Sequence, residues 1–224
     1  MTARLISYSK AVDGLFENDP NLLDLVAYCA RVSNPSNQHN TETSEKLIRY
    51  LIKNAHWSPL EMVSACIEIE TTRDIGRQIL RHRSFSFQEF SQRYADPTES
   101  MSFEIREARL QDPKNRQNSI DLDENDPEHE TIKMHWDGLQ MYIIEQARMA
   151  YEWAIEHGIA KEQARAVLPE GLTMSRMYMN GTLRSWIHYI SLRGGHGTQK
   201  EHIQIARAIA KVISEVFPMT EEFT

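Results

Sequence analysis

The sequence predicts one helix-rich α+β domain over residues 1–224, folded around a small antiparallel sheet. Three observations lead to this prediction. A chain of 224 residues can bury a sizeable core of its own. Most apolar residues recur at helical spacing, while a few short segments alternate between apolar and polar residues. No internal repeat, low-complexity tract or Gly/Ser-rich linker divides the chain, so a single domain is expected.

Short segments provide the predicted strands. Residues 5–8 form an apolar run near the start of the chain, and residues 63–71 alternate apolar and polar side chains, as in a half-buried strand. A weaker alternation over residues 102–110 predicts a further strand.

Longer segments with apolar residues three and four apart predict the helices. In chain order these lie near residues 22–29, 47–52, 73–81, 132–157, 161–168, 182–192 and 199–217. Thr41 or Thr43 is expected to cap the second helix, and Asn54 to end it. Gly158 stops the longest helix, whose expected buried stripe consists of Leu139, Ile143, Ala147, Ala150, Tyr151 and Ala154.

The net charge of −7 is unevenly distributed. Residues 96–130 carry eleven acidic against four basic side chains, and their Asp-Pro and Asn-Asp-Pro turn signals predict an exposed loop. Residues 73–93 and 161–193 each sum to +3, and arginine dominates both segments. Arginine suits the bidentate binding of phosphate or carboxylate. Solvated helix faces are the alternative interpretation of the same charges.

Several classes of protein are disfavoured. The acidic balance argues against a general nucleic-acid binder, and no apolar run reaches the roughly 18 residues of a membrane span. The first residues lack the apolar core of a secretory signal, and Cys29 and Cys66 have no CxxC partner, so a cytoplasmic protein with free thiols is expected. No HExxH, GxGxxG or P-loop motif occurs, and no metal site is predicted.

The most informative stretch covers residues 78–94. A short helix ends in Arg81-His82-Arg83, and an alternating run is then expected to place Glu89, Ser91 and Arg93 on one face of a strand. Arginines at the end of a helix beside a polar strand face could bind a phosphate and a polar ring. The other candidate for anion binding is Gly194-Gly195-His196-Gly197, which is alternatively a tight turn between helices.

These residues resemble a known family. Arg81-His82-Arg83, seven further residues and Ser91-Gln92-Arg93 match the RHR-x7-SxR signature of flavin-dependent thymidylate synthases. His56-Trp57-Ser58-Pro59-Leu60-Glu61 and Ala164-Arg165-Ala166-Val167-Leu168-Pro169 are similar to two other family elements. Leu183-Arg184-Ser185, Leu192-Arg193 and Gln199-Lys200-Glu201 resemble its C-terminal helices. The order of these elements agrees with the family along most of the chain, although Met62, Thr182 and His188 depart from residues common in it.

The resemblance implies the fold of thymidylate synthase-complementing proteins. It also implies methylation of dUMP to dTMP, with FAD as cofactor, NADPH as reductant and methylenetetrahydrofolate as carbon donor, in a homotetramer with shared active sites. No nucleic-acid or membrane partner is expected. Because a flavin carries out the demanding chemistry, the protein has to supply orientation and electrostatics.

Matching positions imply the site residues. The expected dUMP-binding residues are Gln78, Ile79, Leu80, Arg81, Glu89, Phe90, Ser91, Gln92, Arg93, Arg165 and Arg193. The expected FAD-binding residues are Ser58, Arg81, His82, Arg83, Glu89, Thr182, Leu183, Arg184 and His188. Arg193 is the expected catalytic residue, because a fixed cation beside the uracil ring would stabilise the charge that develops on it.

Two other functions remain open from the sequence. A nucleic-acid-binding module could present Arg73, Arg77 and Arg81 on one helix face to phosphates. A non-enzymatic helical oligomer could use the long apolar stripe of residues 132–157 and bind no flavin.

Overall fold

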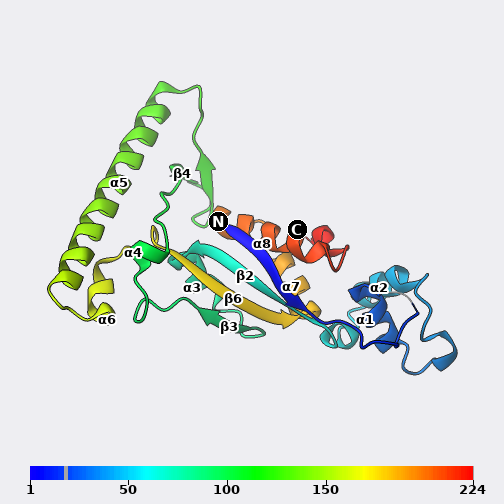
Figure 1. The fold of residues 1–224 in the computed structure, drawn as a ribbon. Coiled ribbons are helices and arrows are strands. Elements are labelled where there is room, and N and C mark those ends of the chain that lie inside the picture. Colours follow the sequence, from blue (N-terminus) through cyan, green and yellow to red (C-terminus); the bar gives the residue numbers. More distant parts are fainter. Residues whose placement is uncertain (18–19, 224) are drawn as a thin grey trace.

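The computed structural model describes residues 1–17 and 20–223 (Figure 1). The strands are β1 (Thr2–Tyr8), β2 (Ser64–Thr72), β3 (Ser86–Glu89), β4 (Arg109–Gln111), β5 (Ser119–Asp121) and β6 (Met174–Thr182). The helices are α1 (Leu22–Ala30), α2 (Ser44–Lys53), α3 (Arg73–Ile79), α4 (Pro97–Ser100), α5 (Pro127–Glu156), α6 (Lys161–Ala164), α7 (Leu183–Arg193) and α8 (Lys200–Ser214). Short 3-10 turns are η1 (Pro35–Asn37), η2 (Ser58–Glu61), η3 (Arg165–Val167) and η4 (Thr220–Phe223). The predicted α+β class with a small antiparallel sheet is confirmed.

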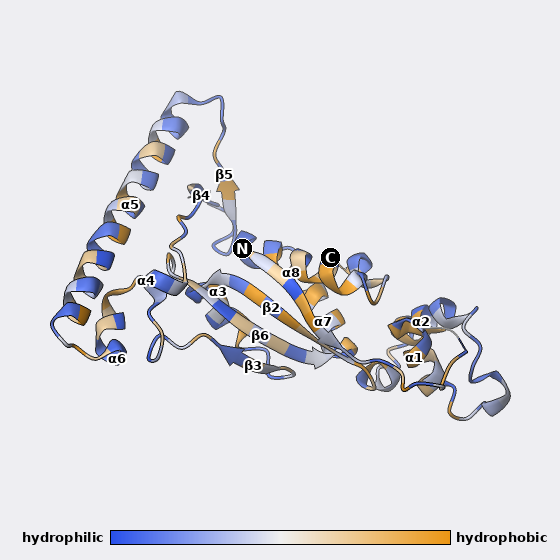
Figure 2. Ribbon diagram, in the orientation of Figure 1, coloured by the Kyte–Doolittle hydropathy of each residue, from blue (hydrophilic) through white to orange (hydrophobic). Residues whose placement is uncertain are grey.

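The main sheet has the order β1-β2-β6-β3, and every neighbouring pair is antiparallel. Ile67 and Ile69 of β2 lie opposite Met179 and Met177 of β6 on one face, and all four side chains are fully buried. Helices α3, α7 and α8 contact the sheet and share its hydrophobic core, and Figure 2 shows the hydrophobic residues along β2 and these helices. The other face is polar: Glu70 pairs with Arg176, and Glu68 with Arg4.

Strand β6 was not among the predicted elements. Its sequence, Met-Ser-Arg-Met-Tyr-Met-Asn-Gly-Thr, contains one β-branched residue and has Asn-Gly before its last residue, so propensity does not favour a strand. The strand forms because Met177 and Met179 pack beside Ile69 and Ile67 of β2 on the buried face of the sheet. Burial of the two methionine side chains outweighs the weak strand propensity.

Two predicted strands are wrong. Residues 102–110 form no continuous strand: Phe103 makes one isolated bridge to Thr173, and β4 begins only at Arg109. Strand β3 ends at Glu89, so Ser91 and Arg93 do not continue its face. The backbone N–H groups of Tyr94 and Ala95 both bond to the carbonyl of Ser91, which closes a turn. The side chain of Gln92 is buried in this turn.

The acidic segment is more structured than expected. Residues 96–130 are not one loop, because they contain α4, the β4–β5 hairpin and the first residues of α5. Asp126 caps α5 by accepting a hydrogen bond from the backbone of Glu128, so the helix begins at Pro127, before the expected position. Gly158 follows its end with a φ of 76°, a conformation that favours glycine.

Helix α5 stands apart from the sheet, while α1 and α2 lie at the opposite end of the molecule (Figure 1). Only part of the expected stripe on α5 is buried. Tyr151, Ala147 and Ala154 are buried, but Leu139 and Ile143 are 45% and 46% exposed, and Ala150 is exposed as well. The buried end of α5 packs with Ala164 and Leu168 into a second, small core.

The remaining helices follow the prediction with shifted ends. Asn54 caps the C-terminus of α2, as expected, and Thr43 stands at its N-cap. The hydroxyl of Thr43 accepts a hydrogen bond from Arg31 and makes none to the first turn of the helix. Helix α3 ends at Ile79, so Arg81 lies beyond the helix that was expected to carry it. Within the described residues no helix is long and apolar enough to cross a membrane.

Candidate active site

The candidate site centres on a contact between the RHR segment and the end of α7. Arg193, the last residue of α7, donates a hydrogen bond from Nε to Nε2 of His82 at 2.9 Å. These two residues are 111 positions apart in the sequence. The contact requires an unprotonated Nε2, and the pKa of His82 is lowered to about 4, chiefly by burial and then by the positive charges of Arg193 and Arg81.

Contacts with β6 and α7 hold the segment that carries His82. The ring of Phe85 lies against Gly181 of β6, where a Cβ atom would stand 2.4 Å from the ring, so a side chain larger than hydrogen would displace it. Phe85 also packs edge-on against Trp186 at 4.6 Å. The hydroxyl of Ser185 donates to the carbonyl of Ser84. Together these contacts hold the loop after α3 against the N-terminal half of α7.

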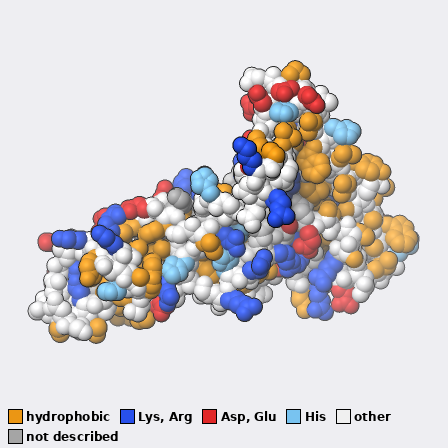
Figure 3. All heavy atoms as spheres, turned by 180° about the vertical axis from the view of Figure 1, so that it is seen from behind, with side chains coloured by type: hydrophobic (Ala, Val, Ile, Leu, Met, Phe, Trp, Pro, Cys, Tyr) orange, Lys and Arg blue, Asp and Glu red, His pale blue; other side chains and the backbone are white. Residues whose placement is uncertain are grey.

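The flanking arginines of the RHR segment are free. Arg81 and Arg83 are exposed, and their guanidinium groups have no hydrogen-bond or ion-pair partner within residues 1–17 and 20–223. Two unpaired cations beside a neutral histidine form a donor set for an anionic ligand. Figure 3 shows Lys and Arg side chains gathered across the middle of the rear face of the molecule.

A second group of predicted residues lies where η2 meets α7. Thr182 caps α7 through a hydrogen bond from the backbone N–H of Ser185, and Arg184 pairs with Glu61 of η2. The ring of His188 lies edge-on against Trp57 at 4.4 Å. Partial burial, followed by the charge of Arg184, lowers the pKa of His188. Ser58 is exposed on η2, so its side chain is accessible beside these residues.

A third group lies around the turn after β3. Arg93 pairs with the carboxylate of Glu162 at 3.3 Å, and Arg165 donates to the backbone carbonyl of the same residue. The hydroxyl of Ser91 accepts a hydrogen bond from the backbone N–H of Arg93 at 3.4 Å. Nε2 of the buried Gln92 lacks a hydrogen-bond partner in the described part of the chain. These residues gather at α6, near one end of α5 (Figure 1).

Glu89 occupies a different environment from its predicted neighbours. Its carboxylate accepts a hydrogen bond from Ser175 and lies 3.6 Å from Arg73 and 3.4 Å from Arg77. Both arginines also pair with Glu170. The arginine face of α3 is thus largely neutralised by carboxylates of the same chain.

Some predicted residues have no side chain available to a ligand. Ile79 and Leu183 are fully buried in the main core, so only their backbone atoms can take part in binding. Within the described residues no hydrogen bond or ion pair joins the Arg93–Arg165 group to the His82–Arg193 pair. The site residues of a single chain therefore form separate groups.

Sequence reasoning missed two residues next to the site, Tyr189 and His202, and noted Gln199 only as part of a segment that resembles the family. Tyr189 and His202 are 1% and 0% exposed and are hydrogen-bonded to each other at 3.0 Å. His202 falls on the apolar face of α8, together with Ile205 and Ile209. A histidine on such a helix face was the available signal, because a buried polar group needs a specific partner.

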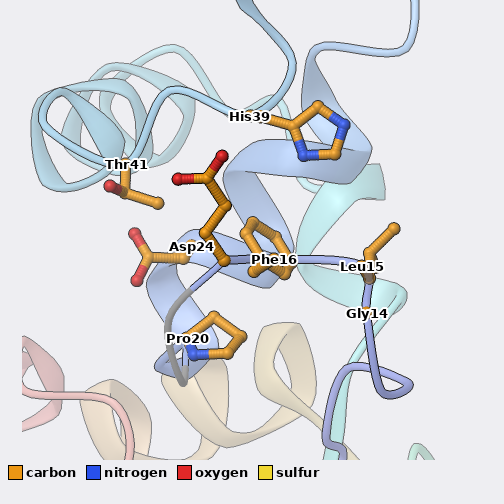
Figure 4. Close-up of a pocket in the computed structure, with 8 residues that line it drawn as sticks. Gly14, Leu15, Phe16, Pro20, Asp24, His39 and Thr41 are labelled. Carbon is orange, nitrogen blue, oxygen red and sulfur yellow. The ribbon is translucent and has the colours of Figure 1, made fainter.

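Other hollows lie away from these residues. Figure 4 shows one of about 720 Å³ beside α1, lined by side chains that include Phe16, Asp24 and His39. It contains none of the predicted site residues. Among the described residues no group of three or more His, Cys, Asp or Glu side chains is arranged to hold a metal ion.

Fold and candidate site define a helix-rich α+β protein in which two unpaired arginines flank a neutral histidine bound to Arg193. Residues 14–219 match the family model described as thymidylate synthase complementing protein. The chain is 48% identical over 219 residues to the flavin-dependent thymidylate synthase of Synechocystis sp. (strain ATCC 27184 / PCC 6803 / Kazusa), covering 97% of this chain and 96% of the relative. It is 45% identical over 218 residues to a probable flavin-dependent thymidylate synthase of Paramecium bursaria Chlorella virus 1, with the same coverage. The chain therefore belongs to the thymidylate synthase complementing protein family.

A solved structure supports the fold. The UMP/dUMP methylase of Streptomyces cacaoi, crystallised with 5-Br dUMP, superposes with a TM-score of 0.75 at 24% sequence identity. The superposition covers 99% of this chain and 93% of the methylase. The resemblance in fold thus extends over nearly the whole molecule.

Proposed function

We propose that the protein is a flavin-dependent thymidylate synthase that methylates dUMP to dTMP with FAD as cofactor. The proposal includes methylenetetrahydrofolate as the carbon donor and NADPH as the reductant. The observation that carries it is the pairing of Arg193 with a neutral His82 inside a segment whose two flanking arginines are unpaired. The family membership and the names of the relatives support the same activity.

The residues around the RHR segment fit FAD. A dinucleotide carries a diphosphate, and the exposed, unpaired guanidiniums of Arg81 and Arg83 are suited to it. His82, Thr182, Arg184, His188 and Ser58 would line the remainder of the cofactor. When bound, the flavin supplies hydride and one-carbon transfer chemistry.

Arg193 is the proposed catalytic residue. Its Nε donates to His82, so the two terminal nitrogens of the guanidinium are available to donate hydrogen bonds to the substrate. Its two N–H donors match the N3–O2 or N3–O4 edge of a uracil ring that has lost the hydrogen on N3, because N3–H of the neutral ring is itself a donor. A fixed cation there stabilises negative charge on the ring and makes carbon 5 a better nucleophile. His82 accepts the hydrogen bond of Arg193 and so holds the guanidinium in one orientation.

The proposed dUMP contacts come from two groups. Arg81 and Arg193 both act on the pKa of His82, and Gln78 is hydrogen-bonded to His202, whose ring lies 6.5 Å from that of His82. Ser91, Arg93 and Arg165 gather instead around Glu162. Phe90 and Gln92 would complete the second group, and Ile79 and Leu80 would contribute backbone atoms. Glu89 would contact the nucleotide from its separate position beside Arg73 and Arg77. Because one chain keeps the two groups apart, the proposal assigns each active site to residues of more than one subunit.

Helix α5 offers the surface for such an assembly. It exposes large apolar side chains over most of its length, among them Met134, Leu139, Tyr142, Ile143 and Trp153 (Figure 3). Monomeric soluble proteins rarely leave so extensive an apolar surface in water. We therefore propose a homotetramer. We also propose a cytoplasmic location, where the free thiols of Cys29 and Cys66 would stay reduced.

The rival functions have less support. A nucleic-acid module would need the arginines of α3 for phosphates, but Arg73 and Arg77 are paired with Glu89 and Glu170. A purely structural oligomer would use α5 but would not need Arg81 and Arg83 unpaired.

A flavin spectrum and a turnover assay test the proposal. Purified protein should show bound flavin and should oxidise NADPH in the presence of dUMP and methylenetetrahydrofolate, with dTMP as product. Protein that binds no added FAD and forms no dTMP would exclude the activity. Salt-dependent DNA or RNA binding in its place would favour the nucleic-acid module.

A further inference from the structure

Four side chains form a line of hydrogen bonds beneath the Arg193–His82 pair. The hydroxyl of Tyr189 on α7 lies 3.0 Å from Nε2 of His202 on α8. Nδ1 of His202 lies 3.2 Å from Oε1 of Gln78 on α3, and Nε2 of Gln78 donates to Oε1 of Gln199 at 2.8 Å. The line therefore connects a buried tyrosine with a residue of the proposed dUMP site. The ring of His82 packs over it, 4.9 Å from that of Tyr189.

The buried end of the line determines which atoms donate. Tyr189 is 1% exposed, and its hydroxyl has no partner other than His202 within the described residues. If the hydroxyl only accepted a hydrogen bond, its own hydrogen would be buried without an acceptor, at a cost of about 1–3 kcal/mol. The hydroxyl therefore donates to Nε2 of His202. A neutral histidine with Nε2 as acceptor carries its hydrogen on Nδ1.

The charge state of His202 supports this arrangement. Its pKa is lowered to about 3, chiefly by burial and then by the positive charge of Arg193 and the neighbouring His82. The imidazole is thus neutral near pH 7, with one donor and one acceptor nitrogen. Nδ1–H donates to Gln78, so the oxygen of the Gln78 amide must face His202. The amide nitrogen consequently faces Gln199 and the site.

We propose that His202, oriented by Tyr189, is a positioning residue that fixes the Gln78 carboxamide so that one N–H is kept for an acceptor oxygen of the nucleotide. One hydrogen of the Gln78 amide is used by Gln199, and the other has no acceptor within the described residues. Without the donor on His202 the amide can rotate by half a turn and present its oxygen instead. The inference rests on the proposed binding of dUMP by Gln78.

Binding and turnover measurements on the FAD-loaded protein separate this role from a general loss of structure. His202→Leu removes the donor and should weaken dUMP binding about tenfold, the effect of losing one oriented hydrogen bond. Turnover at saturating dUMP and flavin occupancy should stay within about threefold of the parent, because Arg193 keeps its contact with His82. His202→Asn, whose amide N–H can replace the Nδ1 donor, should recover most of the affinity. His39→Leu, at an exposed histidine in the hollow beside α1 and away from the predicted site residues, is the matched control.

Nitrogen NMR of histidine-labelled protein reads the tautomer of His202 directly and needs no nucleotide. The parent should carry the hydrogen on Nδ1, and Tyr189→Phe, which keeps the ring but removes the hydroxyl, should show a mixture of tautomers. A hydrogen on Nε2 in the parent, or normal dUMP affinity in His202→Leu, would overturn the inference while leaving the proposed function intact. A parent that binds no dUMP would overturn the proposed function and, with it, the role of Gln78.

Discussion

Arg193 and His82 are joined by a hydrogen bond of 2.9 Å in which the guanidinium donates and the imidazole accepts. Arginine has no acceptor atom, so this contact exists only while His82 is neutral. The lowered pKa of His82 agrees with that requirement. The pair combines a permanent cation with a fixed orientation, the combination needed to stabilise charge on a bound ring.

Replacement of Arg193 should therefore act on turnover. Arg193→Ala is expected to reduce kcat on the order of a hundredfold or more, the usual effect of removing one preorganised charge-stabilising donor. Flavin content and thermal stability should remain near those of the parent. Arg207→Ala, at an exposed arginine on α8, is the control. Turnover of Arg193→Ala within a few-fold of the parent at saturating dUMP would exclude the catalytic role.

Arg83→Ala should lower flavin occupancy. The guanidinium of Arg83 is exposed and has no protein partner in the described residues, so its removal breaks no contact within the chain. Helix content by circular dichroism should be unchanged, while the ratio of flavin to protein absorbance falls. Arg116→Ala, in the exposed β4–β5 hairpin, should keep the parental ratio. Equal flavin content in Arg83→Ala and the parent would remove Arg83 from the cofactor site.

Ser91→Ala should retain dTMP formation and lose mainly affinity for dUMP. The hydroxyl of Ser91 accepts a hydrogen bond from the backbone of Arg93, and no side-chain base is hydrogen-bonded to it in the described structure. It is thus placed to orient a ligand and lacks the activation a nucleophile needs. The measurement is the split between KM and kcat. A covalent adduct between Ser91 and the nucleotide, detected by mass spectrometry, would contradict this role.

A charge placed on the exposed face of α5 should dissociate the assembly. Ile143 is 46% exposed in the single chain, and Ile143→Asp would bury a carboxylate if this face lies between subunits. Sedimentation at micromolar concentration should show a tetramer for the parent and smaller species for the variant. Val12→Asp changes another exposed apolar residue outside α5 and is the control. A monomeric parent would contradict the shared site, including the supply of Arg165 by a neighbouring chain.

Stability should fall as the pH drops below about 6.5. That is the ordinary pKa of histidine, and in the folded chain burial holds the pKa of His82 at about 4 and that of His202 at about 3. The unfolded chain binds these protons first, so the stability present above pH 6.5 is lost progressively between about pH 6.5 and 3. Urea unfolding at several pH values measures the slope. His202→Asn should reduce the slope, whereas His196→Asn should keep it; identical slopes for His202→Asn and the parent would contradict the assignment.

The sequence predicted those helices and strands in which apolar residues recur at the regular spacing of one buried face. Strand β2 and helices α1, α2, α7 and α8 were found because their apolar residues repeat at the spacing of the buried face. Strand β6 was missed because its Met-rich sequence has a weak strand propensity, and the pairing with β2 determines its conformation. The strand expected to include Ser91 ends early, since the backbone turns to bury Gln92.

The site shows the same division. The RHR segment was visible as a cluster of charges, and the resemblance of Leu192-Arg193 to the C-terminal helices of the family drew attention to Arg193. Neither pattern predicts the contact between His82 and Arg193. This contact depends on the position of the loop after α3, which Phe85, Gly181 and α7 hold in place. The line through His202 likewise joins the consecutive helices α7 and α8 to α3, which lies more than one hundred residues earlier in the sequence.

The position of β6 in the sheet bears on how the chain folds during synthesis. Strand β2 lies between β1, which precedes it, and β6, which begins about one hundred residues later at Met174. Until β6 has left the ribosome, one edge of β2 has no partner strand. Ile67 and Ile69 then also lack the two methionine side chains that pack beside them in the folded sheet. Unpaired edges of apolar strands are prone to pair with other chains. A nascent or truncated chain ending before Met174 should therefore aggregate or require a chaperone, whereas the complete sheet has no such edge at β2.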